Sequence, residues 1–246
     1  MSNAPAGRCF GVGVGPGDPE LITVKALKAV QGAPVVAFFA AANAVGNARQ
    51  VVDGYLAPHQ TQLRLQYPVT TETLSGGESY ECIMAAFYDH SAELVAAHLD
   101  AGRNVAVLCE GDPFFYGSFM YIHNRLQDRY QVQVIPGVPA MLAAAAVLGT
   151  PLVCLNEVVS VLSGVLPAEE LEHRMRAADA VVVMKLGRNL AKVRSAVERA
   201  GLLDRAHYVE RATMSTQRVM ALADADPFTS PYFSMVIIPS ATAGLR

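Results

Sequence analysis

The sequence predicts an α/β protein made of two α/β domains, with a mainly parallel sheet in the first and a mixed sheet in the second. Apolar runs typical of strands alternate with runs of helical spacing along the whole chain, which is the pattern of α/β folds. This pattern restarts at residues 136–140, where Pro139 can open a new helix. The 246 residues suffice for two domains of roughly 100–140 residues each. We expect residues 1–138 to form the N-terminal domain and residues 139–246 the C-terminal domain.

Five strands and three helices are expected in the first half of the chain. Apolar clusters predict strands at residues 10–14, 34–39, 62–67 (the weakest), 105–109 and 132–135. Helical spacing predicts helices at residues 19–30, 78–99 and 118–126. Asp18 is expected to cap the first helix, with Pro19 at its first position and Gly32 at its end. Residues 67–78 are rich in Thr, Ser and Gly, which predicts a mobile loop.

The second half continues with further strands and helices. Helices are expected at residues 140–148, 168–178 and 190–200. Strands are expected at residues 158–162, 180–184, 208–210, 218–222 and 233–238. No helix separates the last two strands, so we expect them to form an antiparallel hairpin.

The stretch "GVGVGPGD", residues 11–18, looks like a dinucleotide-binding loop but does not fit that motif. G-x-G-x-x-G needs a third glycine, and the two possible registers place Pro16 or Asp18 there. The acidic residue expected about 20 positions further on is also absent from the next apolar run, residues 34–43. The residues indicate a tight strand-to-helix turn, which either only shapes the backbone or also binds a ligand. They argue against a nicotinamide-dependent oxidoreductase.

Composition excludes several functional classes. The chain is 52% hydrophobic but has no apolar run near 18 residues, which argues against a membrane span. The beginning "MSNAPAGR" lacks the apolar region of a secretory signal, so a cytoplasmic protein is expected. Four cysteines without C-x-x-C spacing and six histidines without a ligand motif predict reduced thiols and no metal site. A net charge of −3 without Trp argues against a nucleic-acid surface.

A second candidate loop, "CEGDPFFYGSFMYI", covers residues 109–122 and follows an apolar strand. Ligand-binding loops lie at the carboxyl ends of such strands. Gly111 lets the backbone approach a ligand, Asp112 offers a carboxylate, and the aromatic residues that follow offer flat surfaces to a ring system. The alternative is that these rings belong to the core and that Asp112 only caps a helix. The "VIPGVPA" turn, residues 134–140, adds a third loop that we expect at the same edge of the first sheet.

Five motifs taken in order resemble the tetrapyrrole (corrin and porphyrin) methylases. They are "VGPGD" with its Val-Lys-Ala helix, "GDPFFYG", the "PG" at the next strand end, "VVVMKLG" at residues 181–187, and "VERATMSTQRV" at residues 209–219. The resemblance implies an S-adenosylmethionine-dependent methyltransferase with a cleft between its two domains, and a homodimer. The first three motifs are most similar to the precorrin-2 C-20 methyltransferases of cobalamin biosynthesis.

Matching the family's motifs residue by residue implies where S-adenosylmethionine binds. The implied cofactor-binding residues are Pro16, Glu110, Gly111, Asp112, Phe115, Pro139, Ala140, Met184 and Ala212. Pro139 departs from the family pattern, because the Ser or Thr usual there could donate a hydrogen bond and proline cannot. By residue type alone, Met184 fits a buried core strand equally well.

The acceptor implied by the resemblance is a reduced tetrapyrrole rich in carboxylates, with S-adenosylhomocysteine as the second product. Candidate contacts to it are Gly15, Tyr116, Lys185, Arg211 and Arg218, since Arg and Lys pair with carboxylates, although each charge could also be ordinary solvated surface. No residue is assigned as the base that removes the C-20 proton. The acceptor's metal content stays open. One alternative is a methyltransferase of the same family that acts on another ring position or another tetrapyrrole, such as cobalt-factor II, uroporphyrinogen III or a later precorrin. Others are a methyltransferase that acts on ribosomal RNA and a carrier protein without turnover.

Overall fold

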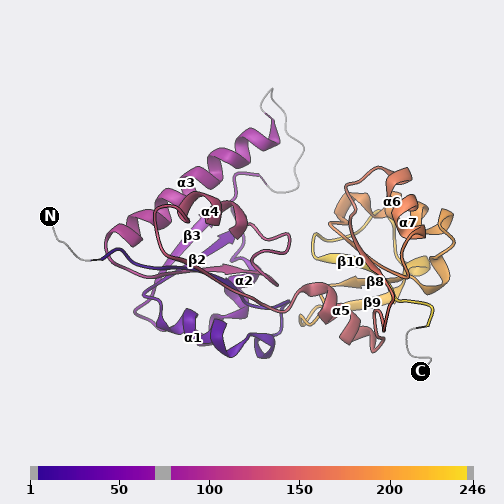
Figure 1. The fold of residues 1–246 in the computed structure, drawn as a ribbon, viewed down its shortest axis with the longest axis horizontal. Coiled ribbons are helices and arrows are strands. Elements are labelled where there is room, and N and C mark those ends of the chain that lie inside the picture. Colours follow the sequence, from indigo (N-terminus) through magenta and orange to yellow (C-terminus); the bar gives the residue numbers. More distant parts are fainter. Residues whose placement is uncertain (1–4, 70–78, 243–246) are drawn as a thin grey trace. The chain divides into compact units, whose positions relative to one another are not determined.

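The computed structural model describes residues 5–69 and 79–242. The chain divides into two compact units, Met1–Pro139 and Ala140–Arg246. Each unit contains one five-stranded sheet, in the order β3-β2-β4-β1-β5 in the first and β6-β7-β10-β8-β9 in the second (Figure 1). The predicted α/β class, with one parallel and one mixed sheet, is confirmed.

The sheet of the first unit is parallel throughout. Its strands are β1 (Cys9–Gly13), β2 (Val35–Ala40), β3 (Thr61–Gln66), β4 (Val105–Cys109) and β5 (Val132–Ile135). The central strands β2 and β4 are buried along their whole length, which is why they are continuous apolar runs rather than alternating ones. All five expected strands, including the weak one, are present.

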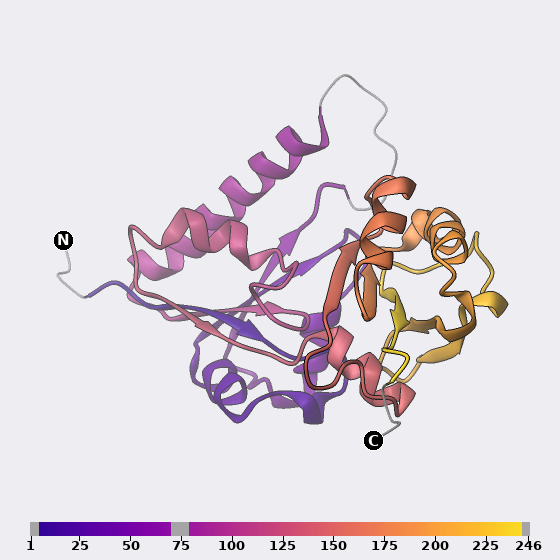
Figure 2. The same cartoon turned by 45° about the vertical axis from the view of Figure 1, so that its right-hand side comes forward.

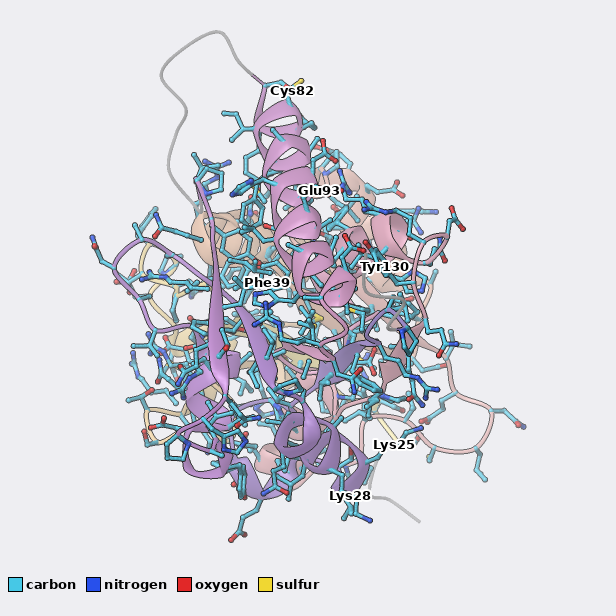
Figure 3. The ribbon with its side chains drawn as sticks, turned by 90° about the vertical axis from the view of Figure 1, so that its left-hand side faces the viewer. Lys25, Lys28, Phe39, Cys82, Glu93 and Tyr130 are labelled. Carbon is cyan, nitrogen blue, oxygen red and sulfur yellow. The ribbon has the colours of Figure 1, made fainter. Side chains whose placement is uncertain are left out.

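Helices cover both faces of this sheet. They are α1 (Val24–Gly32), α2 (Asn47–Val51), α3 (Tyr80–Asp100) and α4 (Phe119–Leu126). One apolar cluster joins α1 and α2 to the sheet, and another joins α3 and α4 to its other face, as Figures 1 and 2 show. In Figure 3, α3 lies over Phe39, while Lys25 and Lys28 mark α1. Strands β1 to β4 therefore each lead into a helix that packs back onto the sheet, and the carboxyl ends of all five parallel strands lie at one edge.

The first helix begins later than expected. Asp18 accepts a hydrogen bond from the Glu20 amide and caps only a short 3-10 helix, Pro19–Leu21. Ile22 and Thr23 are then extended, and the Thr23 hydroxyl caps α1 through the Ala26 amide. The expected single helix was wrong because a second capping residue restarts the helix. It ends at Gly32, as predicted.

The expected mobile loop, residues 67–78, falls mostly outside the described residues, which leave out 70–78. After it, the Ser79 hydroxyl accepts a hydrogen bond from the Cys82 amide and starts α3. Two further short helices, α2 and the 3-10 helix Asp53–Tyr55, were not expected, because five and three residues are too few to show helical periodicity.

The sheet of the second unit contains β6 (Val159–Ser163), β7 (Ala180–Met184), β8 (His207–Glu210), β9 (Arg218–Ala221) and β10 (Ser234–Ile238). The expected hairpin between the last two strands was wrong. Strand β9 pairs antiparallel with β8, whereas β10 lies between β7 and β8 and is antiparallel to both. Burial explains this arrangement, because every residue of β10 is buried and suits a central strand, while β9 is mostly exposed and suits an edge.

Three helices complete the second unit, α5 (Ala140–Leu148), α6 (Ala168–Arg176) and α7 (Leu190–Arg199). Helices α6 and α7 share one apolar cluster with the sheet, and α5 packs in a separate cluster against the other face. Short 3-10 helices follow at Gly187–Asn189, Leu203–Arg205 and Leu222–Asp224. This unit is therefore also a three-layered α/β structure.

Candidate functional site

The carboxyl ends of β1 and β4 form the topological switch point of the first sheet. These strands are neighbours, yet β1 leads to α1 on one face and β4 leads to α4 on the other. In open α/β sheets, ligands bind where the connections of adjacent strands diverge in this way. Both glycine loops identified in the sequence begin at this point.

The two loops contact each other through their backbones. The Gly111 amide donates to the Gly15 carbonyl at 2.8 Å, and the Gly15 amide donates to the Gly111 carbonyl at 3.4 Å. Both residues have positive φ, 82° for Gly15 and 63° for Gly111, a conformation that glycine adopts without steric cost. The glycines are thus required by this junction, whatever it binds.

The third loop joins the same junction through Gly137. A Cβ atom on Gly137 would lie 2.1 Å from the Gly111 carbonyl oxygen and 2.8 Å from the Gly13 Cα. Only glycine allows the three loops to approach this closely. We call Gly13, Gly15, Gly111 and Gly137 the glycine junction. The expectation that the three loops share one edge is confirmed.

Asp112 connects two of these loops. Its Oδ1 accepts from the Phe114 amide at 2.9 Å, and its Oδ2 accepts from the Gly137 amide at 3.1 Å. The carboxylate therefore fixes the second loop to the third, since charged acceptors make the stronger hydrogen bonds. Each carboxylate oxygen still has a further lone pair with which to accept a bond from a ligand.

Glu110 lies just after β4 and points toward α2. Its Oε1 accepts from the Ala48 amide at 3.2 Å. Burial raises the pKa of the Glu110 carboxyl, and hydrogen bonds from the backbone amides of Glu110 and Ala48 partly oppose that rise. Glu110 thus ties the second loop to the start of α2.

The remaining candidates of the first unit surround the junction in sequence. Pro16 is buried directly after Gly15. Phe115 is half-buried, and its ring contacts the exposed ring of Tyr116 edge-on at 5.1 Å between centroids. Pro139 is half-buried and ends the first unit.

Ala140 is the first residue of the second unit and of α5. The other candidates of this unit gather at one edge of its sheet. Strands β7 and β8 run in the same direction, because each is antiparallel to β10. Their carboxyl ends bring Met184 and Lys185 to the same edge as Arg211 and Ala212, and Arg218 starts β9 opposite the end of β8. Met184 is half-buried and Ala212 is buried. The structure therefore collects residues that lie far apart in the sequence.

Backbone strain marks both edges. Four residues other than glycine have left-handed φ values there, Tyr116 (56°), Lys185 (59°), Arg211 (46°) and Thr213 (68°). Such residues are uncommon, and they cluster at active sites and ligand clamps. Lys185 and Arg211 each directly follow a strand, so the chain bends sharply at the edge where the candidate residues of the second unit lie.

One residue at the second edge was missed by the sequence reasoning. Glu210, the last residue of β8, is buried, and its carboxylate oxygens lie 3.6 Å from Nη1 of Arg211 and 3.5 Å from Nη1 of Arg218. The signal that could have found it is a glutamate at the end of the apolar strand "YVE", directly before an arginine. Both candidate arginines thus face a carboxylate of the protein itself.

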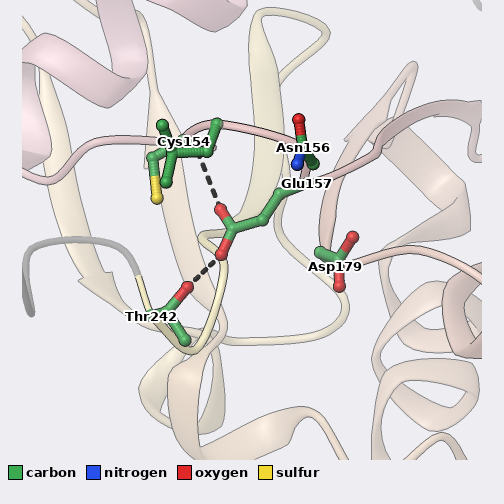
Figure 4. A pocket seen from close by; sticks show the side chains of 6 residues that line it. Cys154, Asn156, Glu157, Asp179 and Thr242 are labelled. Carbon is green, nitrogen blue, oxygen red and sulfur yellow. Dashed lines mark hydrogen bonds between the residues drawn. The ribbon is translucent and has the colours of Figure 1, made fainter.

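A depression of about 260 Å³ lies elsewhere in the second unit and is lined by none of the candidates (Figure 4). Cys154, Leu155, Asn156, Glu157, Asp179 and Thr242 line it. Residues 154–157 precede β6 and Asp179 precedes β7, so it lies at the amino ends of these strands, away from the edge where α/β proteins bind ligands. The Glu157 carboxylate accepts hydrogen bonds from the Cys154 amide and from the hydroxyls of Ser240 and Thr242. This site holds loops together.

In residues 5–69 and 79–242, no three His, Cys, Asp or Glu side chains gather closely enough to hold a metal ion. No helix in the described part of the chain is long and apolar enough to cross a membrane.

Comparison with known proteins agrees with this geometry. A precorrin-2 C(20)-methyltransferase from Sinorhizobium sp is 51% identical over 239 residues, which cover 97% of this chain and 98% of that protein. A cobalt-precorrin-2 C(20)-methyltransferase from Salmonella typhimurium is 26% identical, covering 94% of this chain and 96% of that protein. The solved structure of uroporphyrin-III C-methyltransferase from Thermus thermophilus, complexed with S-adenyl homocysteine, matches with a TM-score of 0.67 and 25% identity, covering 95% of this chain and 92% of that chain. The family model of the tetrapyrrole (corrin/porphyrin) methylases matches residues 8–225, and the chain belongs to this family.

Proposed function

We propose that this protein transfers the methyl group of S-adenosylmethionine to C-20 of precorrin-2 in cobalamin biosynthesis, giving precorrin-3A and S-adenosylhomocysteine. The observation that carries the proposal is the 51% identity, along nearly the whole of both chains, to the Sinorhizobium enzyme of that name. The glycine junction and the charged edge of the second sheet support it, because bare backbone groups suit the methyl donor and cationic side chains suit the carboxylates of the acceptor.

The first unit suits the amino-acid end of the methyl donor. S-adenosylmethionine carries an ammonium, a carboxylate and a sulfonium, which backbone groups and one carboxylate can bind without a phosphate cradle. The glycine junction presents bare backbone at a strand edge, and Asp112 retains acceptor capacity next to it. We assign this end to Glu110, Gly111 and Asp112, with Pro16 and Phe115 as apolar walls.

The second unit supplies the residues proposed for the adenosine end. Met184 ends β7 and Ala212 follows β8, the two strands on either side of β10, and both belong to one apolar cluster that Ala140 joins from the start of α5. Pro139, the last residue of the first unit, directly precedes Ala140. Methionine side chains adapt well to flat rings. Because Pro139 has no N–H, recognition here rests on shape and on carbonyl acceptors.

The acceptor is an anion, and its recognition has to be local. The net charge of −3 gives no overall attraction for a polycarboxylate. Lys185, Arg211 and Arg218 place cationic side chains at one edge of the second sheet. We assign them, with Gly15 and Tyr116, to contacts with the tetrapyrrole.

Catalysis rests on alignment of two large partners. When bound, S-adenosylmethionine would supply the methyl group: the S–CH3 bond breaks with its electrons staying on sulfur, the electron-rich C-20 forms the new C–C bond, and C-20 loses its proton. The chain's contribution is to hold both partners in line, an effect worth up to ~7–11 kcal/mol in favourable cases. The pinned loops suit this role, because Asp112 and the glycine junction restrict their movement.

Three finer features belong to the same proposal. We propose a metal-free acceptor, because the relative named for precorrin-2 is 51% identical and the one named for cobalt-precorrin-2 is 26% identical. We also propose a cytoplasmic homodimer, and domains at residues 1–138 and 139–246. Gel filtration with light scattering tests the dimer, and separate expression of residues 139–246 tests the second domain.

The deciding experiment incubates the purified protein with S-adenosylmethionine and enzymatically made precorrin-2. Gain of one methyl by mass spectrometry, located at C-20 by NMR, is the expected result. Methylation only of cobalt-precorrin-2 or uroporphyrinogen III would keep the family and overturn the acceptor. Donor binding by calorimetry without turnover on any tetrapyrrole would favour a carrier.

A further inference from the structure

The candidate arginines of the second unit are arranged around one buried carboxylate. Glu210 ends β8, and its side chain is only 4% exposed. A buried carboxylate is costly unless it is paired and hydrogen-bonded. The charge of Glu210 is compensated by a hydroxyl network on one side and by two arginines on the other.

On its inner side, Glu210 is held by a hydroxyl network. The Tyr208 hydroxyl donates to Glu210 Oε1 at 3.0 Å and also contacts the Ser230 hydroxyl at 3.0 Å. The Ser230 and Ser234 hydroxyls are 2.7 Å apart, and Ser234 donates to the Pro231 carbonyl. Burial raises the pKa of Tyr208, so this hydroxyl stays protonated and remains a donor at neutral pH. The carboxylate is therefore fixed in position from inside.

On its outer side, Glu210 faces the two arginines. Arg211 Nη1 lies 3.6 Å from Oε2, and Arg218 Nη1 lies 3.5 Å from Oε1. Their side chains remain 38% and 62% exposed. In the described part of the chain, neither guanidinium makes a side-chain hydrogen bond. Each guanidinium has five N–H donors, so both can donate to a carboxylate of a ligand while the ion pair with Glu210 is kept.

The backbone directs both arginines to this place. Arg211 has a left-handed backbone with φ of 46°, and its amide donates to the Phe233 carbonyl at 2.8 Å. Arg218 is the ladder partner of Glu210 in the pairing of β8 with β9. The cluster carries one net positive charge, because two arginines surround one carboxylate.

We propose that Glu210 is a positioning residue, which holds Arg211 and Arg218 as a pair that receives carboxylate groups of the tetrapyrrole acceptor. The proposal rests on the proposed function and names residues of its acceptor site. Glu210 acts only through the arginines, because its own oxygens are buried and already paired. Without it, the two like-charged side chains separate into solvent and lose their shared orientation.

The test replaces Glu210 by Gln, which keeps the size and the bond from Tyr208 but removes the charge. In Glu210→Gln the KM for precorrin-2, measured at saturating donor, is expected to rise about fivefold, the size of one exposed ion pair. The kcat and the Kd for S-adenosylmethionine are expected to stay within about twofold. An unchanged or lower KM in the folded variant overturns the proposal, and so does a change confined to the Kd for S-adenosylmethionine, whose own carboxylate would then be the ligand.

Glu172 provides a matched control. It also pairs with two arginines, Arg176 and Arg199, each at 2.8 Å, but it lies on α6 rather than at the strand edge. Glu172→Gln is therefore expected to leave the KM unchanged. If Glu210→Gln does not fold, Tyr208→Phe tests the proposal instead. This variant removes one hydrogen bond from Glu210 and should raise the KM for precorrin-2 about twofold.

Two further measurements separate the possible failures. In an Arg211→Gln/Arg218→Gln background, Glu210→Gln should have no additional effect on KM, whereas an undiminished effect overturns action through the arginines. Binding of uroporphyrin, followed by its own fluorescence, reports recognition of a polycarboxylate tetrapyrrole without turnover. Suppose that the wild-type protein binds uroporphyrin more tightly than Glu210→Gln does but does not methylate precorrin-2. This result would overturn the proposed function and leave the role of Glu210 standing.

Discussion

Replacement of Gly137 by Ala should destabilise the first unit and weaken donor binding. The new Cβ would lie 2.1 Å from the Gly111 carbonyl oxygen and 2.8 Å from the Gly13 Cα. These are backbone atoms, so no side chain can rotate away, and the three loops must separate. The separation also breaks the hydrogen bond from the Gly137 amide to Asp112, which is 3.1 Å long.

The expected loss follows from these two contacts. A hydrogen bond to a charged group contributes about 1.5–3 kcal/mol, and an extra methyl in a close-packed site costs about 1–3 kcal/mol. The free energy of unfolding should therefore fall by about 3–5 kcal/mol, a large part of the ~5–15 kcal/mol typical of natural proteins. Calorimetric titration should show weaker binding of S-adenosylmethionine.

Urea unfolding of Gly137→Ala and Gly32→Ala, measured side by side, tests the reasoning. Nothing lies within 4 Å of a Cβ on Gly32, and this residue ends α1, where alanine favours the helix by up to about 1 kcal/mol. Gly32→Ala should therefore be neutral or stabilising. A Gly137→Ala protein as stable as wild type, with unchanged donor affinity, would refute the close contact of the three loops.

Three other perturbations have expected outcomes. Asp112→Asn keeps one acceptor oxygen for the amides of Phe114 and Gly137 but removes the negative charge, so the Kd for S-adenosylmethionine should rise about tenfold. A wild-type Kd measured by calorimetry would show that Asp112 does not belong to the donor site. Hydrogen bonds from Ser240, Thr242 and the Cys154 amide lower the pKa of Glu157 from 4.5 to about 2, so its ionised form stabilises the fold above about pH 4.5 and this contribution is lost as the pH falls toward 2. Glu157→Gln should accordingly be less stable than wild type at neutral pH, with a difference that shrinks on acidification, and a difference independent of pH in urea titrations would contradict the assignment. Burial raises the pKa of Cys9 to about 12 and that of Cys109 well above its usual range. Iodoacetamide at mildly alkaline pH should therefore modify the exposed Cys82 and spare both buried thiols. Mass spectrometry that finds Cys9 or Cys109 alkylated in the folded protein would count against their burial in the core.

The features that local chemistry determines could be predicted from the sequence. Continuous apolar runs such as "VAVLC" at residues 105–109 indicate buried parallel strands, and glycines after two strands indicate close backbone contact. The meeting of the three loops followed from topology, because the carboxyl ends of parallel strands share one edge. The roles assigned to the individual site residues remain predictions.

The features that depend on distant partners could not be predicted. The place of β10 between β7 and β8 depends on how the whole sheet buries its apolar residues, and adjacency in sequence suggested the wrong neighbour. Likewise, Thr23 rather than Asp18 caps α1, although both residue types are good caps. The interaction of Glu210 with Arg218 depends on the register of β8 with β9, which a single sequence does not display.

The place of β10 has a consequence for biosynthesis. The pairs β6–β7 and β8–β9 can form as soon as their residues leave the ribosome, but they cannot join each other until Ser234–Ile238 is made. Until then β7 and β8 both present open edges, which favour pairing with other chains, and the late strand must close contacts of large sequence separation, which slows folding. A nascent chain that pauses after β9 is therefore the species most exposed to aggregation and the one that a chaperone would most usefully hold.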